Sequence, residues 1–270
     1  DALIFAGATL VVLPLVPDRP MGPYGALNPH SIWILVILVM AISAAGYVAV
    51  RLLGAQFGLP IAGLASGFIS STATIGAMGT RVAKTMDLLA AAVAGAVLST
   101  IATIVQMALV LAATSTATLR ALSAPLICAG LAAIVYGMVF TVRALQQKTE
   151  SEARDGRAFS LSTALGFALT LSVILVASAA LRDRFGETGI IVAAALAGFV
   201  DTHSAAISVA SLVVLGKMSA ADAVFPILAG LSTNTMSKMV IADISGGRSF
   251  ALRVIPGLIV VALAAWVGAL

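Results

Sequence analysis

Residues 195–207 read ALAGFVDTHSAAI, and residues 63–75 read GLASGFISSTATI. Each stretch places a Gly-Phe pair and then a cluster of hydroxyl or ionisable side chains inside an apolar run. An ionised Asp at the centre of a membrane helix costs about 2.5–3.5 kcal/mol on insertion scales. Asp201, with His203 two positions later, is therefore a candidate for a binding site or a pathway.

The spacing of Asp201 and His203 bears on the backbone around them. Residues two apart point about 200° apart on a regular helix but share a face of an extended segment. If both side chains serve one ligand, the helix must be unwound there, and paired broken helices are typical of transporter sites. The alternative is that Asp201 caps a half-helix and His203 hydrogen-bonds a neighbour.

The composition of the whole chain decides its broad class. Of 270 residues, 61% are hydrophobic and 10% are charged, and the mean hydropathy is +1.12. A soluble domain carries roughly a quarter charged residues, so this chain has too little polar surface for water and is predicted to be an integral membrane protein. This excludes a cytosolic enzyme, a disulfide scaffold and a nucleic-acid reader as first interpretations, and the single cysteine, Cys128, agrees.

Apolar runs predict where the helices lie. A bilayer core needs about 20 apolar residues per helix, and alternating strand patterns are missing from the sequence. We therefore expect an all-α, polytopic helical bundle with about seven to nine membrane segments. The candidate runs are 2–16, 31–53, 59–83, 88–113, 124–142, 159–181, 189–215, 220–244 and 250–270.

The chain is expected to contain an internal duplication. Gly67 and Gly198 are 131 positions apart, and a second match, LST at 98–100 and 231–233, is offset by 133. A polar linker separates the two halves. The expected organisation is a leading helix and loop at 1–30, repeat 1 at 31–146, the linker at 147–158 and repeat 2 at 159–270.

The basic residues bear on the topology of 59–83 and 189–215. If every run crosses the membrane, the two sides carry similar numbers of Lys and Arg. If these two segments re-enter, ten of the 15 basic residues fall on one side, and the repeats become inverted. Those ten are Arg51, Arg81, Lys84, Arg143, Lys148, Arg154, Arg157, Lys238, Arg248 and Arg253. We expect each repeat to contain a broken or re-entrant helix.

A second polar group lies on the helix around residues 231–238. Asn234, Thr235 and Lys238 are three and four positions apart, so a helix presents them on one side. Lys238 is either functional or a residue that snorkels near a helix end. In the first half, Ser99, Thr100, Thr103 and Gln106 occupy the corresponding helix.

Several stretches resemble a known family. LNPHSIW at 27–33, AGYVAVRLLG at 45–54, GFISSTAT at 67–74, GFVDTHSA at 198–205 and LSTNT at 231–235 are similar to the C-terminal membrane domain of MgtC/SapB-type bacterial proteins, which has no assigned activity. The family often has an acid where this chain has His203, which counts against a purely carboxylate site. The resemblance implies a multi-pass protein of the bacterial inner membrane with an MgtC-like domain upstream in the full-length chain.

The preferred functional hypothesis is a membrane transporter of a small ion or solute, with a midplane site where the two broken helices meet. A cation such as Mg²⁺, Na⁺ or H⁺ is favoured because hard oxygen ligands dominate. Asp201 and His203 are the candidate metal ligands, and no cofactor other than such a cation is expected. The expected site consists of Asp201, Thr202, His203, Ser204, Ser70, Ser71, Thr72, Thr74, Asn234, Thr235 and Lys238.

Two other classes of function are alternatives to transport. A non-transporting regulator or scaffold would bind another membrane protein through small-residue helix faces such as Gly63 and Gly67. An intramembrane hydrolase is disfavoured because an Asp and a His two positions apart cannot easily form a catalytic triad, in which the acid orients the His and the His activates a nucleophile. The protein is therefore not expected to be an enzyme. Its expected partners are the lipid bilayer, the transported ion or solute and further copies of itself, and not nucleic acid.

Overall fold

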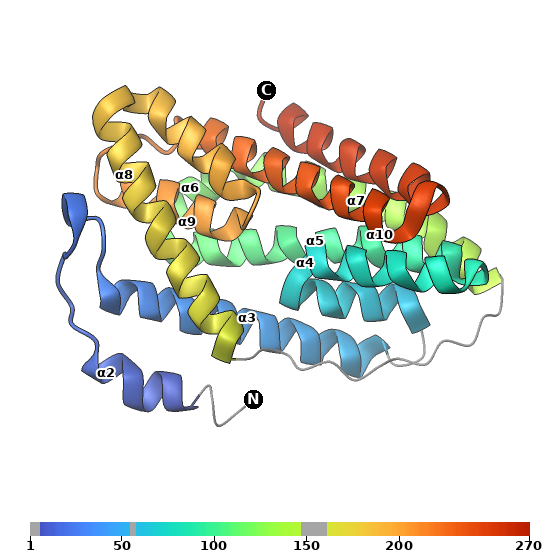
Figure 1. Ribbon diagram of the computed structural model, residues 1–270. Coiled ribbons are helices and arrows are strands. Elements are labelled where there is room, and N and C mark those ends of the chain that lie inside the picture. The colour runs from blue at the N-terminus through green and yellow to red at the C-terminus, as the bar shows by residue number, and fades with distance from the viewer. Residues whose placement is uncertain (1–5, 55–57, 147–160) are drawn as a thin grey trace. The chain divides into compact units, whose positions relative to one another are not determined.

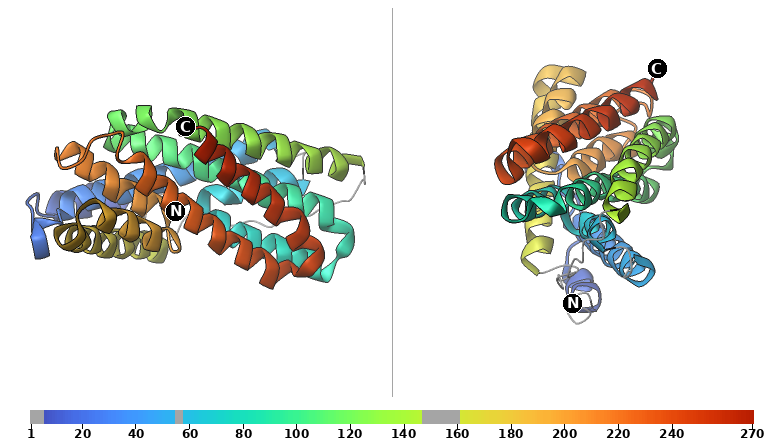
Figure 2. Two further views of the ribbon diagram at one scale, coloured as in Figure 1. Left: turned by 90° about the horizontal axis from the view of Figure 1, so that it is seen from above. Right: turned by 90° about the vertical axis from the view of Figure 1, so that its right-hand side faces the viewer.

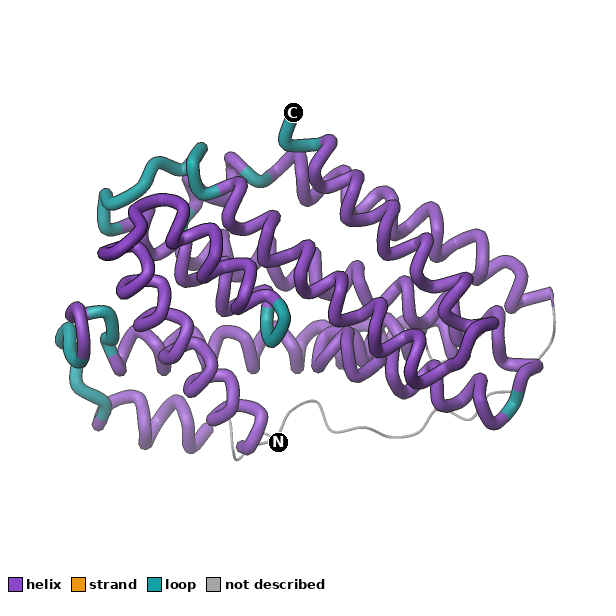
Figure 3. The backbone as a smooth tube through the Cα atoms, turned by 45° about the horizontal axis from the view of Figure 1, so that its top comes forward, coloured by secondary structure: helices purple, strands orange, loops and turns teal. Residues whose placement is uncertain are grey.

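The structure is a computed structural model that describes residues 6–54, 58–146 and 161–270. Helices make up nearly all of this part of the chain, and no strand occurs in it (Figure 1, Figure 3). The main helices are α3 (Pro29–Gly54), α4 (Gly58–Lys84), α5 (Leu89–Thr114), α7 (Ser123–Gln146), α8 (Leu161–Gly198), α9 (Thr202–Val214) and α10 (Val224–Val267). The short helices are a π-turn at Ala8–Val12, α2 (Leu13–Leu15), 3-10 turns at Pro23–Gly25 and Met86–Leu88, and α6 (Thr116–Ala121).

The all-helical prediction is confirmed for the described residues, whereas the predicted number of seven to nine membrane segments stays a prediction. Within the described ranges, four helical stretches meet the length and composition of a membrane span when breaks inside them are disregarded: Gly58–Lys84, Met86–Thr114, Ser123–Leu145 and Val224–Val267. The chain is thus a membrane protein by the length and composition of its helices. The predicted linker at 147–158 and the start of the predicted run at 2–16 lie outside the described residues.

Two long helices each contain a reversal at a glycine. Gly186 in α8 has φ 59° and ψ −136°, and Gly247 in α10 has φ 66° and ψ −179°. Positive φ values of this kind strain residues that carry a Cβ, so glycine is the residue that permits the turn. Figure 2 shows α10, in red, folding back on itself at this point. The reversals fall in the gaps between the predicted runs 159–181 and 189–215, and between 220–244 and 250–270.

The helices form two compact units, each assembled from both halves of the sequence. Unit 1 consists of residues 1–42, 107–122 and 159–234, and unit 2 of residues 43–106, 123–158 and 235–270. The core of unit 1 includes Ile32, Val110, Leu171 and Ile207. The core of unit 2 includes Leu59, Ile75, Val93, Phe140, Phe250 and Val254. The linear repeats 31–146 and 159–270 stay a prediction.

Candidate functional site

The motif of the first half forms a sharp break within α4, in unit 2. Ser70 has φ −164° and ψ 110°, which is extended backbone inside a helical segment. Thr74 Oγ1 donates to Ser66 Oγ at 2.9 Å, although eight residues of straight helix would separate them by about 12 Å. The two halves of α4 therefore fold toward each other. The Oγ of Ser70 accepts from the main-chain N–H of Ala73 at 3.2 Å and so caps the second half.

The α4 hairpin packs closely on α5. A Cβ built on Gly63 would lie 2.3 Å from Cα of Gly95, and one built on Gly67 would lie 2.7 Å from Cα of Ser99. Only a residue without a side chain permits such backbone contact. These glycines are therefore required by packing inside unit 2.

The motif of the second half forms a similar hairpin in unit 1. The end of α8 and the start of α9 are joined at Asp201, which has φ −154° and ψ 119°. Ala194 before the break and Ala205 after it both lie within 3.3 Å of the Cβ position of Gly230, on α10. The two half-helices therefore fold together against α10, as the halves of α4 do against α5.

The two hairpins share one register. Ser70 and Asp201 are 131 positions apart, and so are Gly67 and Gly198. The Cβ position of Gly198 lies 2.1 Å from the carbonyl oxygen of Gly230, which is 131 positions after Ser99. The close contact of each glycine with its supporting helix thus keeps the 131-residue offset, whereas the LST letters match at 133.

Side-chain amides satisfy carbonyl groups that the helix breaks leave open. In unit 2, Gln106 Nε2 donates to the carbonyl oxygen of Phe68 at 2.9 Å. In unit 1, Asn234 Nδ2 donates to the carbonyl oxygen of Gly198 at 3.1 Å. An unsatisfied main-chain group inside a membrane costs several kcal/mol, so these amides stabilise the breaks.

Asp201 is the N-cap of α9, which is the alternative that the sequence left open. Its Oδ1 accepts from the main-chain N–H of His203 at 3.2 Å, and its Oδ2 from that of Ser204 at 2.8 Å. The imidazole Nδ1 of His203 lies 3.1 Å from Oδ1, and the hydroxyl of Ser204 donates to Oδ2. The helix is also unwound at this point, as the sequence predicted for a site.

These contacts occupy the Asp201 carboxylate. A carboxylate has about four lone-pair positions, and four protein groups surround this one. Among the described residues, no group of three or more His, Cys, Asp or Glu side chains is placed to hold a metal. Asp201 and His203 thus supply two protein ligands whose facing atoms already contact each other. Metal binding by this pair stays a prediction.

Thr202 is the polar residue of this turn whose hydroxyl is unsatisfied. It is 2% exposed, and its Oγ1 has no hydrogen-bond partner among the described residues. The neighbouring Ser204 is also buried. One buried hydroxyl beside the Asp201–His203 pair is therefore available to a bound water or solute.

A hydrogen-bonded chain runs to the break in unit 2. Lys238, 1% exposed, donates from Nζ to Thr103 Oγ1 at 3.2 Å, and Thr103 donates to Ser71 Oγ at 2.8 Å. A snorkelling lysine would place its ammonium in the polar interface, so its burial contradicts that interpretation. Lys238 therefore belongs to the polar cluster of unit 2.

The predicted site residues divide between the units. Unit 1 contains Asp201, Thr202, His203, Ser204 and Asn234. Unit 2 contains Ser70, Ser71, Thr72, Thr74, Thr235 and Lys238. Thr103 and Gln106 were not placed in the site from the sequence, although they lie on the helix that corresponds to the one bearing Asn234. A buried pair, Ser208 Oγ donating to Ser178 Oγ at 3.1 Å, was also missed, because isolated serines are common in membrane helices.

Comparison with known families bears on the whole of this region. A family model described as a domain of unknown function, DUF4010, matches residues 37–246. The chain belongs to the DUF4010 family. The match includes both hairpins, with Ser70 and Asp201, and Lys238. Nothing in it connects the chain to MgtC/SapB-type proteins specifically. No curated protein and no solved structure matches the chain.

Proposed function

We propose that this DUF4010 protein carries a small ion or solute across a membrane. The observation that carries the proposal is the pair of helical hairpins, broken at Ser70 and at Asp201, with polar side chains at each break. Helix breaks of this kind are costly in a bilayer and are typical of transporter binding regions. The expectation that the two breaks meet at one midplane site stays a prediction.

The lengths of the half-helices support re-entrant segments. The halves 58–69 and 71–84 are roughly 18 and 21 Å long, and the halves 187–198 and 202–214 roughly 18 and 20 Å, at 1.5 Å per residue. The hydrocarbon core is about 30 Å thick, so none of the four crosses it alone. We propose that each hairpin re-enters, leaving the membrane on the side where it entered, and that the two hairpins do so from opposite sides, which makes the two repeats inverted.

The contacts of Asp201 favour a proton over a metal as the transported ion. A metal ion would have to displace the donors that already surround the carboxylate, whereas a proton can move between Asp201 and His203 across 3.1 Å. Histidine is the side chain that takes up and releases protons near neutral pH. In this proposal the pair carries the proton, and the Thr202 hydroxyl contacts the solute or a water.

Proton entry into liposomes tests the proposal. The purified protein is reconstituted with an entrapped pH dye, and a potassium diffusion potential drives protons inward. We expect acidification well above that of empty liposomes, and its loss in Asp201→Asn and His203→Gln. Asn is as good an N-cap as Asp, so Asp201→Asn keeps the helix start while it removes the charge.

Asp243→Asn is the matched control, because Asp243 is an exposed acid in unit 2. This variant should acidify the liposomes as the unchanged protein does. Equal proton entry through the Asp201→Asn protein, or no entry through the unchanged protein, would contradict the proposal.

The helix face with Gly63 and Gly67, which was the candidate binding surface of a scaffold protein, is covered within unit 2. Gly63 and Gly67 are buried against α5 inside unit 2, so they are not free to receive another membrane protein. Bacterial inner-membrane localisation and an upstream MgtC-like domain rest on the sequence resemblance and remain proposals. The protein is proposed not to be an enzyme.

A further inference from the structure

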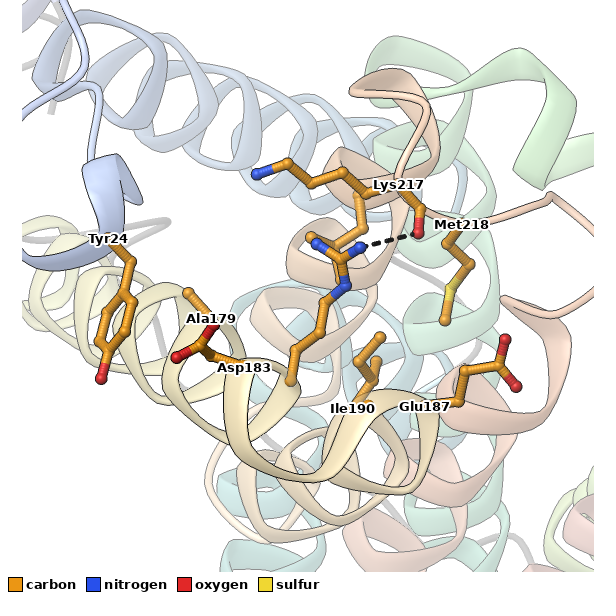
Figure 4. Close-up of a pocket in the computed structure, with 10 residues that line it drawn as sticks. Tyr24, Ala179, Asp183, Glu187, Ile190, Lys217 and Met218 are labelled. Atoms are coloured by element: carbon orange, nitrogen blue, oxygen red, sulfur yellow. Dashed lines mark hydrogen bonds between the residues drawn. The ribbon is translucent and has the colours of Figure 1, made fainter.

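Unit 1 contains a polar cavity of about 510 Å³ at the reversal of α8. Its lining includes Tyr24, Arg182, Asp183, Glu187, Lys217 and Met218. In Figure 4, Lys217 lies across the cavity from the turn of α8 that carries Asp183 and Glu187, and Tyr24 lies on the Asp183 side. Charges of both signs thus face one cavity. Such a concentration of charge in an apolar chain is typical of the membrane–water interface.

The basic side of the cavity is held by the end of α9. The N–H of Lys217 donates to the carbonyl of Leu212 at 2.9 Å, and that of Gly216 to Val213 at 3.0 Å. With Gly216 at φ 66°, these bonds form a Schellman turn, which fixes the backbone of Lys217. Arg182 then donates from Nη2 to the carbonyl oxygen of Lys217 at 3.2 Å. Arg182 is therefore bonded to the main chain of Lys217, and both cationic residues line the same cavity.

The acidic side is formed by α8 around its reversal. Asp183 precedes Gly186 and Glu187 follows it, and both side chains are exposed. Among the described residues, neither carboxylate has a hydrogen-bond or ion-pair partner. The cavity therefore offers two anionic groups and two cationic groups that do not neutralise one another by direct pairing.

A second cavity of unit 1, about 430 Å³, borders the same two elements. Adjacent residues line the two cavities. Tyr24 and Leu212 line the polar cavity, and their neighbours Gly25 and Ser211 line the second one. Its other walls are largely apolar and include Ile32, Leu175 and Ile207. A polar and an apolar cavity thus flank the 20–28 segment and the last turn of α9.

We propose that these two cavities bind one phospholipid whose headgroup carries both a phosphate and a primary ammonium, as in phosphatidylethanolamine. Arg182 and Lys217 bind the phosphate, because guanidinium and ammonium groups form charge-assisted hydrogen bonds with its oxygens. Asp183 and Glu187 bind the ammonium. The apolar cavity receives the first part of an acyl chain. This site is separate from Asp201 and His203, so it stands or falls independently of transport.

Thermal unfolding of the purified protein in detergent tests the site. Three additives are titrated: phosphatidylethanolamine, phosphatidylglycerol, which lacks the ammonium, and soluble phosphoethanolamine, which lacks the acyl chains. We expect phosphatidylethanolamine to raise the midpoint most. In Arg182→Gln/Lys217→Gln its apparent affinity should fall about tenfold. In Asp183→Asn/Glu187→Gln the preference over phosphatidylglycerol should disappear.

Arg184→Gln is the matched control, since Arg184 lies on the same turn, is exposed and does not line the cavity. It should respond as the unchanged protein does. Ala113→Trp fills the apolar cavity and should abolish the effect of the lipid. If the double variants are unstable, Lys217→Gln and Glu187→Gln are measured singly.

Equal stabilisation of all variants by phosphatidylethanolamine would overturn the proposal, as would the lack of any effect on the unchanged protein. Soluble phosphoethanolamine acting as strongly as the lipid, with Ala113→Trp unaffected, would identify a free zwitterion as the ligand and overturn the lipid assignment.

Discussion

Asn234 donates a hydrogen bond from its side-chain amide to the carbonyl oxygen of Gly198, 3.1 Å away, across 36 positions of sequence. The bond closes the last turn of α8 just before the chain leaves the helix at Asp201. Gln106 does the same for Phe68 in unit 2. Each break is therefore stabilised by an amide from the helix on which its hairpin packs.

Replacing Asn234 by Ala should destabilise unit 1. The Gly198 carbonyl would lose its partner inside a buried turn, which costs about 1–3 kcal/mol. We expect a lower midpoint of thermal unfolding in detergent. Met236→Ala, at an exposed position of the same helix, is the control and should change the midpoint little. Equal midpoints for Asn234→Ala and the unchanged protein would show that the bond does not support the break.

Gly198→Ala should destabilise the protein more than an ordinary glycine replacement does. The new Cβ would lie 2.1 Å from the carbonyl oxygen of Gly230, so the backbones would have to separate. Overpacking of this kind costs about 1–3 kcal/mol or more. Gly166→Ala, on α8 with nothing within 4 Å of its Cβ, should be neutral or stabilising. Thermal unfolding of the two variants checks the contrast.

Lys238 and Thr103 should be energetically coupled. Their hydrogen bond joins two buried side chains, and Thr103 in turn donates to Ser71. A double-mutant cycle with Lys238→Met and Thr103→Val should give a coupling free energy of about 1 kcal/mol or more, which unfolding in denaturant measures. Strictly additive effects of the two replacements would mean that the bond contributes nothing.

The re-entrant topology predicts where cysteine labels react. In a Cys128→Ser background, Arg51→Cys and Lys84→Cys flank the α4 hairpin, so both should react with a membrane-impermeant reagent from the same side. Lys217→Cys is expected on the opposite side of the membrane. Labelling of residues 51 and 84 from opposite sides would show instead that α4 crosses the membrane and would exclude the inverted repeats.

The class of the protein and the places of the two breaks could be predicted from the sequence. The low charge content and long apolar runs indicated a helical membrane protein, and runs such as 88–113 and 124–142 lie within the observed helices α5 and α7 apart from single terminal residues. The polar clusters at 67–74 and 198–206 marked the breaks. Polar side chains within an apolar run are costly unless they form hydrogen bonds, and a helix break exposes main-chain groups with which they can do so. Thr103 and Gln106 could not be assigned in this way, since Ser, Thr and Gln also serve helix packing.

The roles of single side chains depended on tertiary structure. Sequence could indicate that Asp201 is exceptional, because one acid within an apolar run is visible without coordinates. It could not choose between a ligand and a helix cap, because that choice depends on how the chain turns and which N–H groups then face the carboxylate. The burial of Lys238 could not be predicted from the sequence either. Whether its ammonium group lies in water or in a polar cluster depends on which helices pack around it. Packing between segments distant in the sequence therefore decided both the capping role of Asp201 and the burial of Lys238.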